Sequence, residues 1–250
     1  MTKAGKLYSG AAAVVVLVVA GSLVYVLHGG TTARPAARRP PAASSPLPQP
    51  VSTSPVAAPV HVAAAPKPAV PHQLVAPAAP TAFEIKGNAF DVKAQVCGMD
   101  YIRPLDPPGD QFHTVCWVQR DFGVAPGSDA KGTSYILGHA WAEAWLVLNP
   151  LSVYAMDHVA TAPTMQGGIA TYPVSGLSGY HVTLRTPTGL LTYRVTDAYT
   201  VAKEQAGSVP ALMDEHTPDR IVIITCGVHN GADVDVNVVV YATLESSKAA

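Results

Sequence analysis

The sequence predicts a mostly β chain, with a single barrel-like domain and a few short helices between residues 82 and 250. Short runs rich in β-branched and aromatic side chains recur from Phe83 to Leu244, separated by Gly, Pro, Asn and Asp. The two runs nearest the C-terminus, 221–226 and 236–244, are almost continuously apolar. Continuous apolar strands are typical of sheets covered on both faces, so we expect a closed or covered sheet.

The N-terminus is a predicted membrane anchor. Residues 1–6 contain Lys3 and Lys6, and residues 7–28 form an uncharged run rich in Ala, Val and Leu. A helix of about 20 such residues crosses the ~30 Å hydrocarbon core, and preceding basic residues favour a cytoplasmic N-terminus. A cleaved signal peptide is the alternative, although its apolar core is usually only about 7–15 residues long. Both readings export the rest of the chain, and we expect a single-pass cell-membrane protein with an extracellular domain.

A linker is predicted for residues 29–81, where Pro, Ala, Ser, Val and Thr dominate and no helical or strand periodicity appears. Frequent proline removes backbone donors and favours a disordered, extended chain. The globular domain then spans residues 82–250.

The elements of this domain follow from local patterns. The segment 187–189, Pro-Thr-Gly, is a turn signal that joins two alternating runs into a hairpin. Helical patterns are few and short, at residues 141–146 and 210–215. In chain order, we expect strands at 83–85, 90–96, 134–137, 180–186, 190–196, 221–226 and 236–244.

Composition excludes several functions. Charged residues make up 13% of the chain and the net charge is −1, so no basic patch indicates nucleic-acid binding. The three cysteines have no CxxC spacing and the nine histidines form no HExxH motif, so we expect no metal centre.

Two residues at predicted strand ends are candidates for nucleophilic catalysis. Cys226 ends the strand 221–226, and His139 follows the upstream strand 134–137 after one glycine. A thiolate nucleophile with a histidine base, adjacent in space but not in sequence, is a common catalytic arrangement. Either residue alone is more often a core residue, and His229 is a competing base.

The other two cysteines, Cys97 and Cys116, are predicted to form a disulfide because the domain is exported. Two buried free thiols are the alternative.

Three motifs together resemble the sortase family, in an actinobacterial-type form similar to classes E and F. Residues 135–139, Tyr-Ile-Leu-Gly-His, resemble the family's strand-Gly-His motif, and residues 223–226, Ile-Ile-Thr-Cys, resemble its Leu-x-Thr-Cys motif. The hairpin at 179–195 precedes the cysteine strand as in sortases. The resemblance covers roughly residues 83–244.

The resemblance implies a membrane-anchored cysteine transpeptidase. Sortases cleave a sorting signal, commonly of the Leu-Pro-x-Thr-Gly type, in exported proteins. Cys226 would form an acyl-thioester, and an amine of peptidoglycan precursor or a pilin would resolve it. His139 would exchange protons with the departing and arriving amines. The reaction needs no cofactor.

The chain departs from the family at the third catalytic residue, an Arg on the strand after the cysteine. The sequence has no Arg after Arg220, and Asn237 stands near the position where the Arg is expected. We expect Asn237 to donate a hydrogen bond to the oxyanion, although it cannot supply the charge. Alternatively, Asn237 only caps a strand edge. Arg185 or Arg194 of the hairpin is a further candidate for the missing charge.

Two other functions remain open. One is a sortase-like domain that has lost activity and binds exported proteins or another envelope component. The other is a different envelope cysteine enzyme. An L,D-transpeptidase is disfavoured because it would show Ser-x-Gly-Cys-x-Arg, and an NlpC/P60 peptidase because its cysteine precedes its histidine.

Overall fold

The computed structural model describes residues 72–250. The predicted anchor at 7–28 and most of the predicted linker at 29–81 lie outside the described residues. Across residues 72–250, no helix combines the length and the apolar character that a membrane crossing needs.

The described residues are mostly β, as predicted. Their helical segments are α1 (Asn149–Asp157), α2 (Pro210–Met213) and a 3-10 turn, η1 (Ala206–Ser208). The strands are β1 (Ala82–Lys86), β2 (Asp91–Asp100), β3 (Thr114–Arg120), β4 (Thr133–Leu137), β5 (Thr164–Gln166), β6 (Ile169–Pro173), β7 (His181–Thr186), β8 (Gly189–Ala202), β9 (Arg220–His229) and β10 (Ala232–Ala249).

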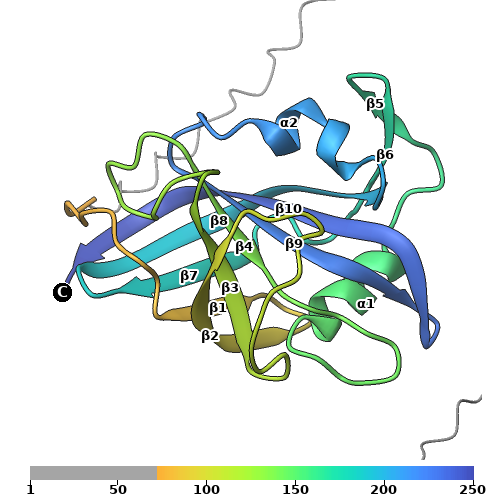
Figure 1. The fold of residues 1–250 in the computed structure, drawn as a ribbon, viewed down its shortest axis with the longest axis horizontal. Helices are drawn as coiled ribbons and strands as arrows, with labels where there is room; N and C mark the ends of the chain where they lie inside the picture. Colours follow the sequence, from red (N-terminus) through yellow and green to blue (C-terminus); the bar gives the residue numbers. More distant parts are fainter. Residues whose placement is uncertain (1–71) are drawn as a thin grey trace, which may run out of the picture. The chain divides into compact units, whose positions relative to one another are not determined.

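Eight strands close into a barrel, as Figure 1 shows. Their order around the sheet is β10-β9-β4-β3-β2-β1-β7-β8, and pairing between β8 and β10 closes the ring. The pairs β2–β3 and β4–β9 are parallel, and the other pairs in the ring are antiparallel. The short strands β6 and β5 extend the sheet from β8.

Both faces of β9 are covered, which confirms the prediction from its apolar sequence. Ile221 and Ile223 belong to a core cluster that includes residues of β1, β7 and β8. Val222 points to the opposite face and packs in a second cluster with residues of α2 and the distal part of β8. Burying an aliphatic side chain of this size contributes about 1.5–3 kcal/mol. Strong burial on both sides therefore fixes the strand that carries Cys226. This strand does not end at Cys226, as predicted, but continues to His229 because β10 pairs with it up to that residue.

The predicted helix at residues 141–146 is wrong. These residues form a loop in which the side chains of Trp141 and Trp145 are 44% and 66% exposed. The helix lies just downstream instead, where Pro150 occupies its first turn and Leu151 and Ala155 are buried. Proline favours this position because its fixed φ suits the helix start and its missing N–H costs nothing there. Helix α2 falls within the predicted range 210–215.

The end of the predicted linker packs against the barrel. Residues 72–81 contain neither helix nor strand, yet Val75 is 1% exposed. Its backbone N–H donates to Ser128 Oγ at 2.8 Å, and the N–H of Gln73 donates to Ser247 O at 3.1 Å. The packed part of the chain therefore begins several residues before residue 82.

Candidate active site

Parallel pairing of β4 with β9 places His139 beside Cys226. The last paired residues of the two strands are Leu137 and Ile224, and the N–H of Gly138 donates to Ile224 O at 3.2 Å. His139 and Cys226 each follow two residues after that pair. Side chains alternate with period two, so opposite residues of a parallel pair point to the same face. The sheet register thus brings together the two predicted catalytic residues.

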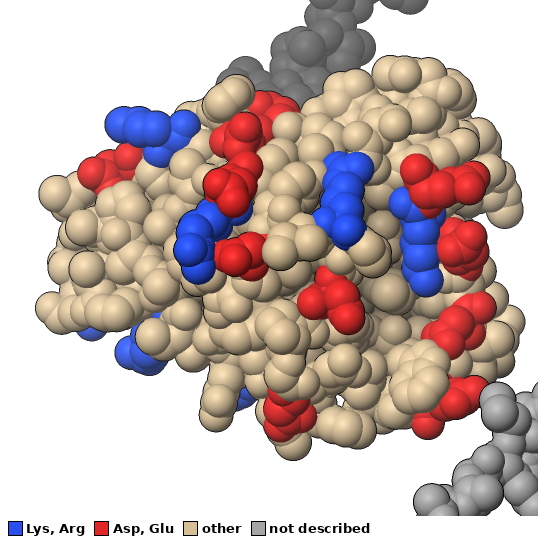
Figure 2. Space-filling view, in the orientation of Figure 1, with Lys and Arg blue, Asp and Glu red and all other residues tan. Residues whose placement is uncertain are grey.

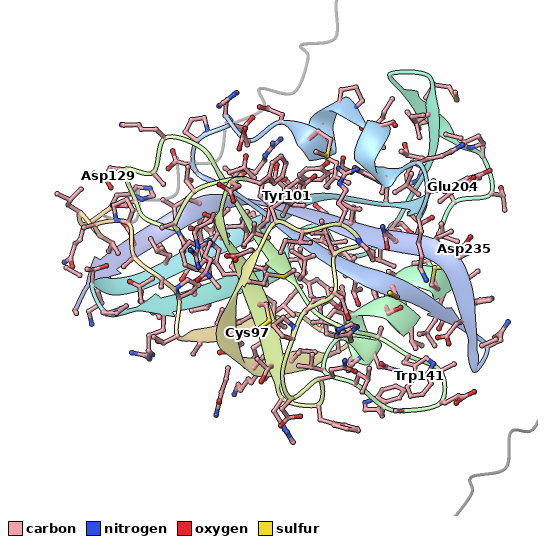
Figure 3. All side chains as sticks on the ribbon, in the orientation of Figure 1. Cys97, Tyr101, Asp129, Trp141, Glu204 and Asp235 are labelled. Atoms are coloured by element: carbon pink, nitrogen blue, oxygen red, sulfur yellow. A yellow bond between two sulfur atoms is a disulfide. The ribbon has the colours of Figure 1, made fainter. Side chains whose placement is uncertain are left out.

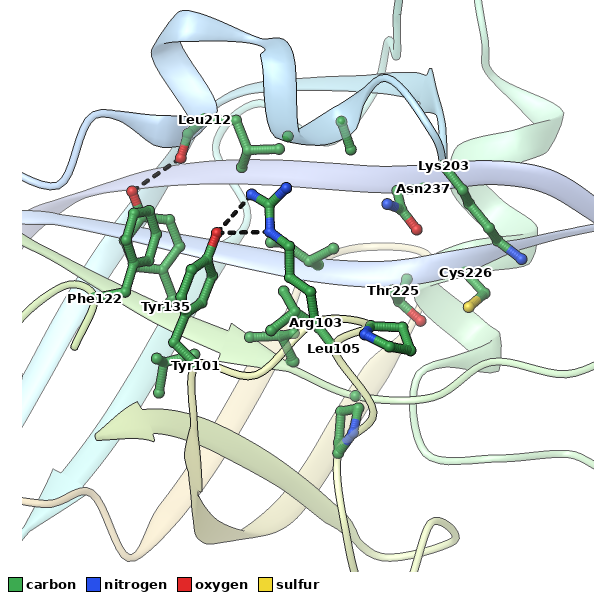
Figure 4. A pocket seen from close by; sticks show the side chains of 18 of the residues that line it. Tyr101, Arg103, Leu105, Phe122, Tyr135, Lys203, Leu212, Thr225, Cys226 and Asn237 are labelled. Carbon is green, nitrogen blue, oxygen red and sulfur yellow. Dashed lines mark hydrogen bonds between the residues drawn. The ribbon is translucent and has the colours of Figure 1, made fainter. Parts of the chain in front are cut away.

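Both side chains line one cavity of about 310 Å³. Figure 4 shows this cavity, with Cys226 labelled. Its walls are mainly apolar and come from the β2–β3 loop, from β4 and β9, and from the segment that contains η1 and α2. Its other polar lining residues include Asn237, Thr225, Lys203 and Arg103. The hydroxyl of Thr225 is buried and has no hydrogen-bond partner within the described residues. A largely apolar pocket with a few convergent polar groups is typical of a ligand site.

Asn237 lies opposite Cys226 on the neighbouring strand. The two residues are partners in the antiparallel pairing of β9 with β10, and the register shifts between Val234 and Asn237. Such bulges are common beside active sites because they redirect a side chain. The structure therefore places Asn237 in the cavity with Cys226 and His139.

The imidazole of His139 is held by the β2–β3 loop. Its Nε2 lies 3.0 Å from Pro107 O and 3.3 Å from Asp106 Oδ1. A carbonyl oxygen only accepts hydrogen bonds, so Nε2 carries the hydrogen in this contact. Nδ1 is then the nitrogen with a free lone pair. The His139 side chain is 19% exposed, whereas that of Asp106 is 78% exposed.

Burial raises the pKa of the Cys226 thiol above its ordinary value. The charge of Lys203 opposes this effect, and the carboxylates of Asp233 and Asp106 add to it. Burial disfavours the charged thiolate, because the cavity solvates it less well than water does. The resting thiol is therefore neutral at pH 7, and attack on a carbonyl requires a proton acceptor nearby.

The backbone around Cys226 is fixed by helix α1. Ser152, which is fully buried, donates from Oγ to Cys226 O at 2.7 Å and accepts from the N–H of Val228 at 2.8 Å. Strand β4 ends at Leu137, so it cannot pair with this part of β9. The Ser152 hydroxyl instead forms hydrogen bonds with the C=O of Cys226 and the N–H of Val228. Ser152 lies in no recognisable motif, so this contact could not be predicted from the sequence.

Two cationic residues that were not predicted from the sequence, Arg103 and Lys203, line the cavity. Arg103 comes from the Pro-rich β2–β3 loop, and Lys203 follows β8. The two arginines proposed from sequence lie elsewhere. Arg194 pairs with Glu245, and Arg185 lines a separate hollow on the β1–β2–β7 sheet. No local pattern around Arg103 or Lys203 could have indicated their position.

Two further predictions concern His229 and the pair of cysteines. His229 lies outside the cavity, with its Nδ1 3.5 Å from Asp157 Oδ1. Cys97 and Cys116 form the predicted disulfide between β2 and β3, which leaves Cys226 as the free thiol. Figure 3 labels Cys97 on its strand. Between residues 72 and 250, no group of three His, Cys, Asp or Glu side chains could hold a metal ion.

Surface charge is mixed in sign. On the face in Figure 2, lysines and arginines alternate with acidic residues and form no single-sign patch. Exposed ion pairs such as Arg120–Asp100, with 3.1 Å between Nε and Oδ1, are part of this pattern. Pairs of this kind contribute little to stability, about 0–1 kcal/mol each.

Comparisons with known proteins give structural similarities alone. No family model and no curated protein matches the sequence. Among solved structures, sortase A of Listeria monocytogenes matches with a TM-score of 0.43 and 16% identity, covering 69% of this chain and 91% of that one. Sortase C-1 of Actinomyces oris matches with a TM-score of 0.41 and 15% identity, covering 65% and 72%. Sortase C of Streptococcus pneumoniae matches with a TM-score of 0.41 and 13% identity, covering 68% of each chain.

Proposed function

We propose that this chain is a sortase-type cysteine transpeptidase. Cys226 attacks a peptide carbonyl in an exported protein, and an amine later resolves the thioester. One observation carries the proposal: Cys226 and His139 each lie two residues after Ile224 and Leu137, the last paired residues of the parallel strands β9 and β4, and both line one cavity. A buried core cysteine or a structural histidine would not need this shared, open surface.

Proton transfer in this mechanism is assigned to His139. The thiol of Cys226 is neutral at rest and must lose its proton as Sγ bonds to the carbonyl carbon. His139 Nδ1 can take that proton, because Nε2 is engaged with Pro107 O. The imidazolium then protonates the departing amine as the C–N bond breaks. In the second half, the incoming amine bonds to the thioester carbon and neutral His139 takes its proton. The imidazolium passes that proton to Sγ as the C–S bond breaks, which restores the thiol.

Two groups are proposed to stabilise the negative charge that develops on the oxygen of the tetrahedral intermediate. Asn237 can donate an amide N–H, and one such donor is worth about 3–4 kcal/mol of barrier. Lys203 supplies the positive charge that an asparagine lacks. Both residues line the cavity that contains Cys226, and Figure 4 shows them near its thiol.

The resemblance in sequence supplies the finer proposals. We propose that the donors are exported proteins with a C-terminal sorting signal, and that the acceptor is an amine of peptidoglycan precursor or a pilin. We also propose that residues 7–28 anchor the chain in the cell membrane, with the catalytic domain outside. Neither nucleic acid nor a cofactor has a part in this reaction.

The proposal is tested with the full chain and peptides of the Leu-Pro-x-Thr-Gly type. Intact-mass spectrometry should detect an acyl adduct on Cys226, which an added amine converts to ligated product. Cys226→Ala should abolish the adduct, and His139→Gln should slow its formation by about 10²–10⁴-fold. If no peptide of a broad panel forms an adduct and peptides still bind, the chain is a binding module instead.

A further inference from the structure

The Cys226 cavity contains cationic side chains and no carboxylate. Arg103 and Lys203 line it, together with His139, and no Asp or Glu is among the described residues of its wall. Most of the remaining wall is apolar. Its apolar side chains include Leu105, Phe122, Leu137, Leu212 and Ile224. The chain as a whole has a net charge of −1, so the cationic lining is local. The two carboxylates that act on Cys226, those of Asp106 and Asp233, lie outside this lining.

The guanidinium of Arg103 is held in place by neutral groups. Nε and Nη2 donate to the hydroxyl of Tyr101 at 3.0 and 2.5 Å, and Nη2 lies 3.6 Å from the sulfur of Met213. Figure 4 shows the contact with Tyr101 and the guanidinium extending into the cavity. A Cβ added to Gly207 would lie 2.3 Å from Nη1, so the absence of a side chain there makes room for the guanidinium.

Arg103 differs from the arginines that have a structural partner. Arg120, Arg194 and Arg220 each pair with a carboxylate. Within residues 72–250, no carboxylate lies within 4.0 Å of the Arg103 guanidinium. Its planar set of N–H donors matches the two oxygens of a carboxylate, and such pairs combine charge with two parallel hydrogen bonds. A fixed guanidinium at an apolar wall, without a counterion, suits an anionic group supplied by a ligand.

We propose that Arg103 binds a carboxylate of the acyl-donor peptide and thereby selects acidic donors. This proposal rests on the proposed function, because it takes Cys226 as the acylated residue. The acyl part of the donor stays bonded to Sγ, in the same cavity as Arg103. Since its own terminal carboxyl is the thioester, the carboxylate must be an Asp or Glu side chain before the scissile bond. Arg103 is thus a specificity residue, and Lys203 lies at the thiol end.

The test measures thioester formation without an amine acceptor. Donor peptides carry Glu, Gln or Lys at each position before the scissile bond in turn, with the other positions randomised. The full chain should acylate about 10- to 100-fold faster with Glu than with Gln at one position, the ratio expected for a hydrogen bond between charged groups. In Arg103→Gln this preference should fall to within about 2-fold, and Arg103→Glu should prefer Lys.

Two further variants separate the role of Arg103 from a general effect of charge or folding. Gly207→Ala leaves the guanidinium intact but displaces it, and should weaken the preference for Glu. Arg185→Gln removes another arginine that has no ion pair among the described residues and lies outside this cavity, and should keep the preference. An equal rate with Glu and Gln at every position, or a preference that survives Arg103→Gln, overturns the proposal.

Binding separates this proposal from the proposed function. Cys226→Ala and Cys226→Ala/Arg103→Gln are titrated with the same Glu and Gln peptides in a fluorescence-anisotropy assay. If no peptide acylates the full chain, yet Glu peptides bind Cys226→Ala about 10-fold tighter and the difference needs Arg103, the carboxylate site stands and the transpeptidase fails. If neither variant distinguishes Glu from Gln, or if the preference appears only in the amine acceptor, the donor site is wrong.

Discussion

The hydroxyl of Ser152 donates a hydrogen bond to the carbonyl oxygen of Cys226 at 2.7 Å. The Oγ of Ser152 also accepts a hydrogen bond from the N–H of Val228 at 2.8 Å, so one side chain of α1 spans the backbone on both sides of Gly227. Because β4 has ended at Leu137, these strand groups have no strand partner on that side. Ser152 therefore replaces a missing strand and fixes the backbone that carries the thiol.

Removing this hydroxyl should lower both stability and reactivity. In Ser152→Ala, a buried carbonyl and a buried N–H lose their partner, which costs about 1–3 kcal/mol of unfolding free energy. The backbone of Cys226 also gains freedom, so the rate of Cys226 acylation should fall by about 10-fold or more. Urea unfolding and single-turnover acylation measure the two effects.

A matched control exists elsewhere in the fold. Ser134 is also buried and donates from Oγ to Val124 O at 2.8 Å, away from the thiol. Ser134→Ala should lose comparable stability and keep the acylation rate of the folded fraction. Equal rate losses in the Ser134 and Ser152 variants would mean that Ser152 is merely structural.

The pKa of Cys226 should respond in opposite directions to two neighbouring charges. Lys203 favours the thiolate, so Lys203→Met should raise the thiol pKa further. Asp233 opposes the thiolate, so Asp233→Asn should lower that pKa and keep the hydrogen bond that its Oδ1 accepts from Ala142. The rate of iodoacetamide alkylation against pH reports both changes, because only the thiolate reacts.

The sign of the pH effect on stability follows from the same raised pKa. The unfolded chain loses the Cys226 proton at a lower pH than the folded chain does. As pH rises above the ordinary thiol pKa, this residue therefore lowers the unfolding free energy.

The alkylation experiment on Lys203→Met and Asp233→Asn has a control in Lys93→Met, on the distant strand β2. This variant also loses a lysine and should leave the dependence of the alkylation rate on pH unchanged. If the pH dependence of alkylation moved in the same direction in Lys203→Met, Asp233→Asn and Lys93→Met, the opposite effects assigned to Lys203 and Asp233 would be wrong.

Asn237 should matter to the transition state more than to the fold. Asn237→Ala should reduce the acylation rate by about 10²–10³-fold, because it removes an oxyanion donor. Asn237→Asp should be worse, since it adds a negative charge where negative charge develops. Both are measured as kcat/KM for one donor peptide, alongside thermal unfolding. A stability loss without a rate loss would leave Asn237 as the strand-edge cap that the sequence also allowed.

Much of the barrel could be predicted from sequence because its strands have strong local patterns. The hairpin of β7 and β8 has alternating residues and a turn, and the strand before Cys226 is continuously apolar. Strand β3 was missed because the prolines that precede it dominate the interpretation of that region. Helix α1 was missed because its apolar face is short, and its position depends on contact with β9 rather than on its own sequence pattern.

The candidate site was partly predictable for a similar reason. His139 follows one recognisable strand and Cys226 lies within another, so their proximity required only that the two strands pair in parallel. Asn237 could be predicted as a site residue because it lies on the strand after Cys226, near the position where the family's Arg is expected. Arg103 and Lys203 enter from loops whose path depends on long-range packing, and no sequence spacing specifies that path. The sequence therefore pointed only to arginines of the hairpin as replacements for the missing catalytic Arg, and one of them, Arg194, pairs with Glu245 instead.

The disulfide of Cys97 with Cys116 should support activity as well as stability. It joins neighbouring strands on either side of the loop that contains Arg103 and Pro107. Closing a loop of 19 residues contributes about 3 kcal/mol in the chain-entropy model. Cys97→Ala/Cys116→Ala should therefore unfold at a lower temperature and at a lower urea concentration. Its acylation rate should also fall, because Pro107 O holds the ring of His139 in place.

Two measurements separate these effects. Intact mass after alkylation, with and without reductant, should add one label to the folded oxidised chain and three after reduction and unfolding, because the chain has three cysteines and one is free. Acylation is then compared at a temperature where both proteins are fully folded. If the double variant keeps the wild-type rate there, the disulfide stabilises the barrel but does not position the β2–β3 loop. A reduced rate, with unchanged alkylation of Cys226, locates the defect at His139 and not at the thiol.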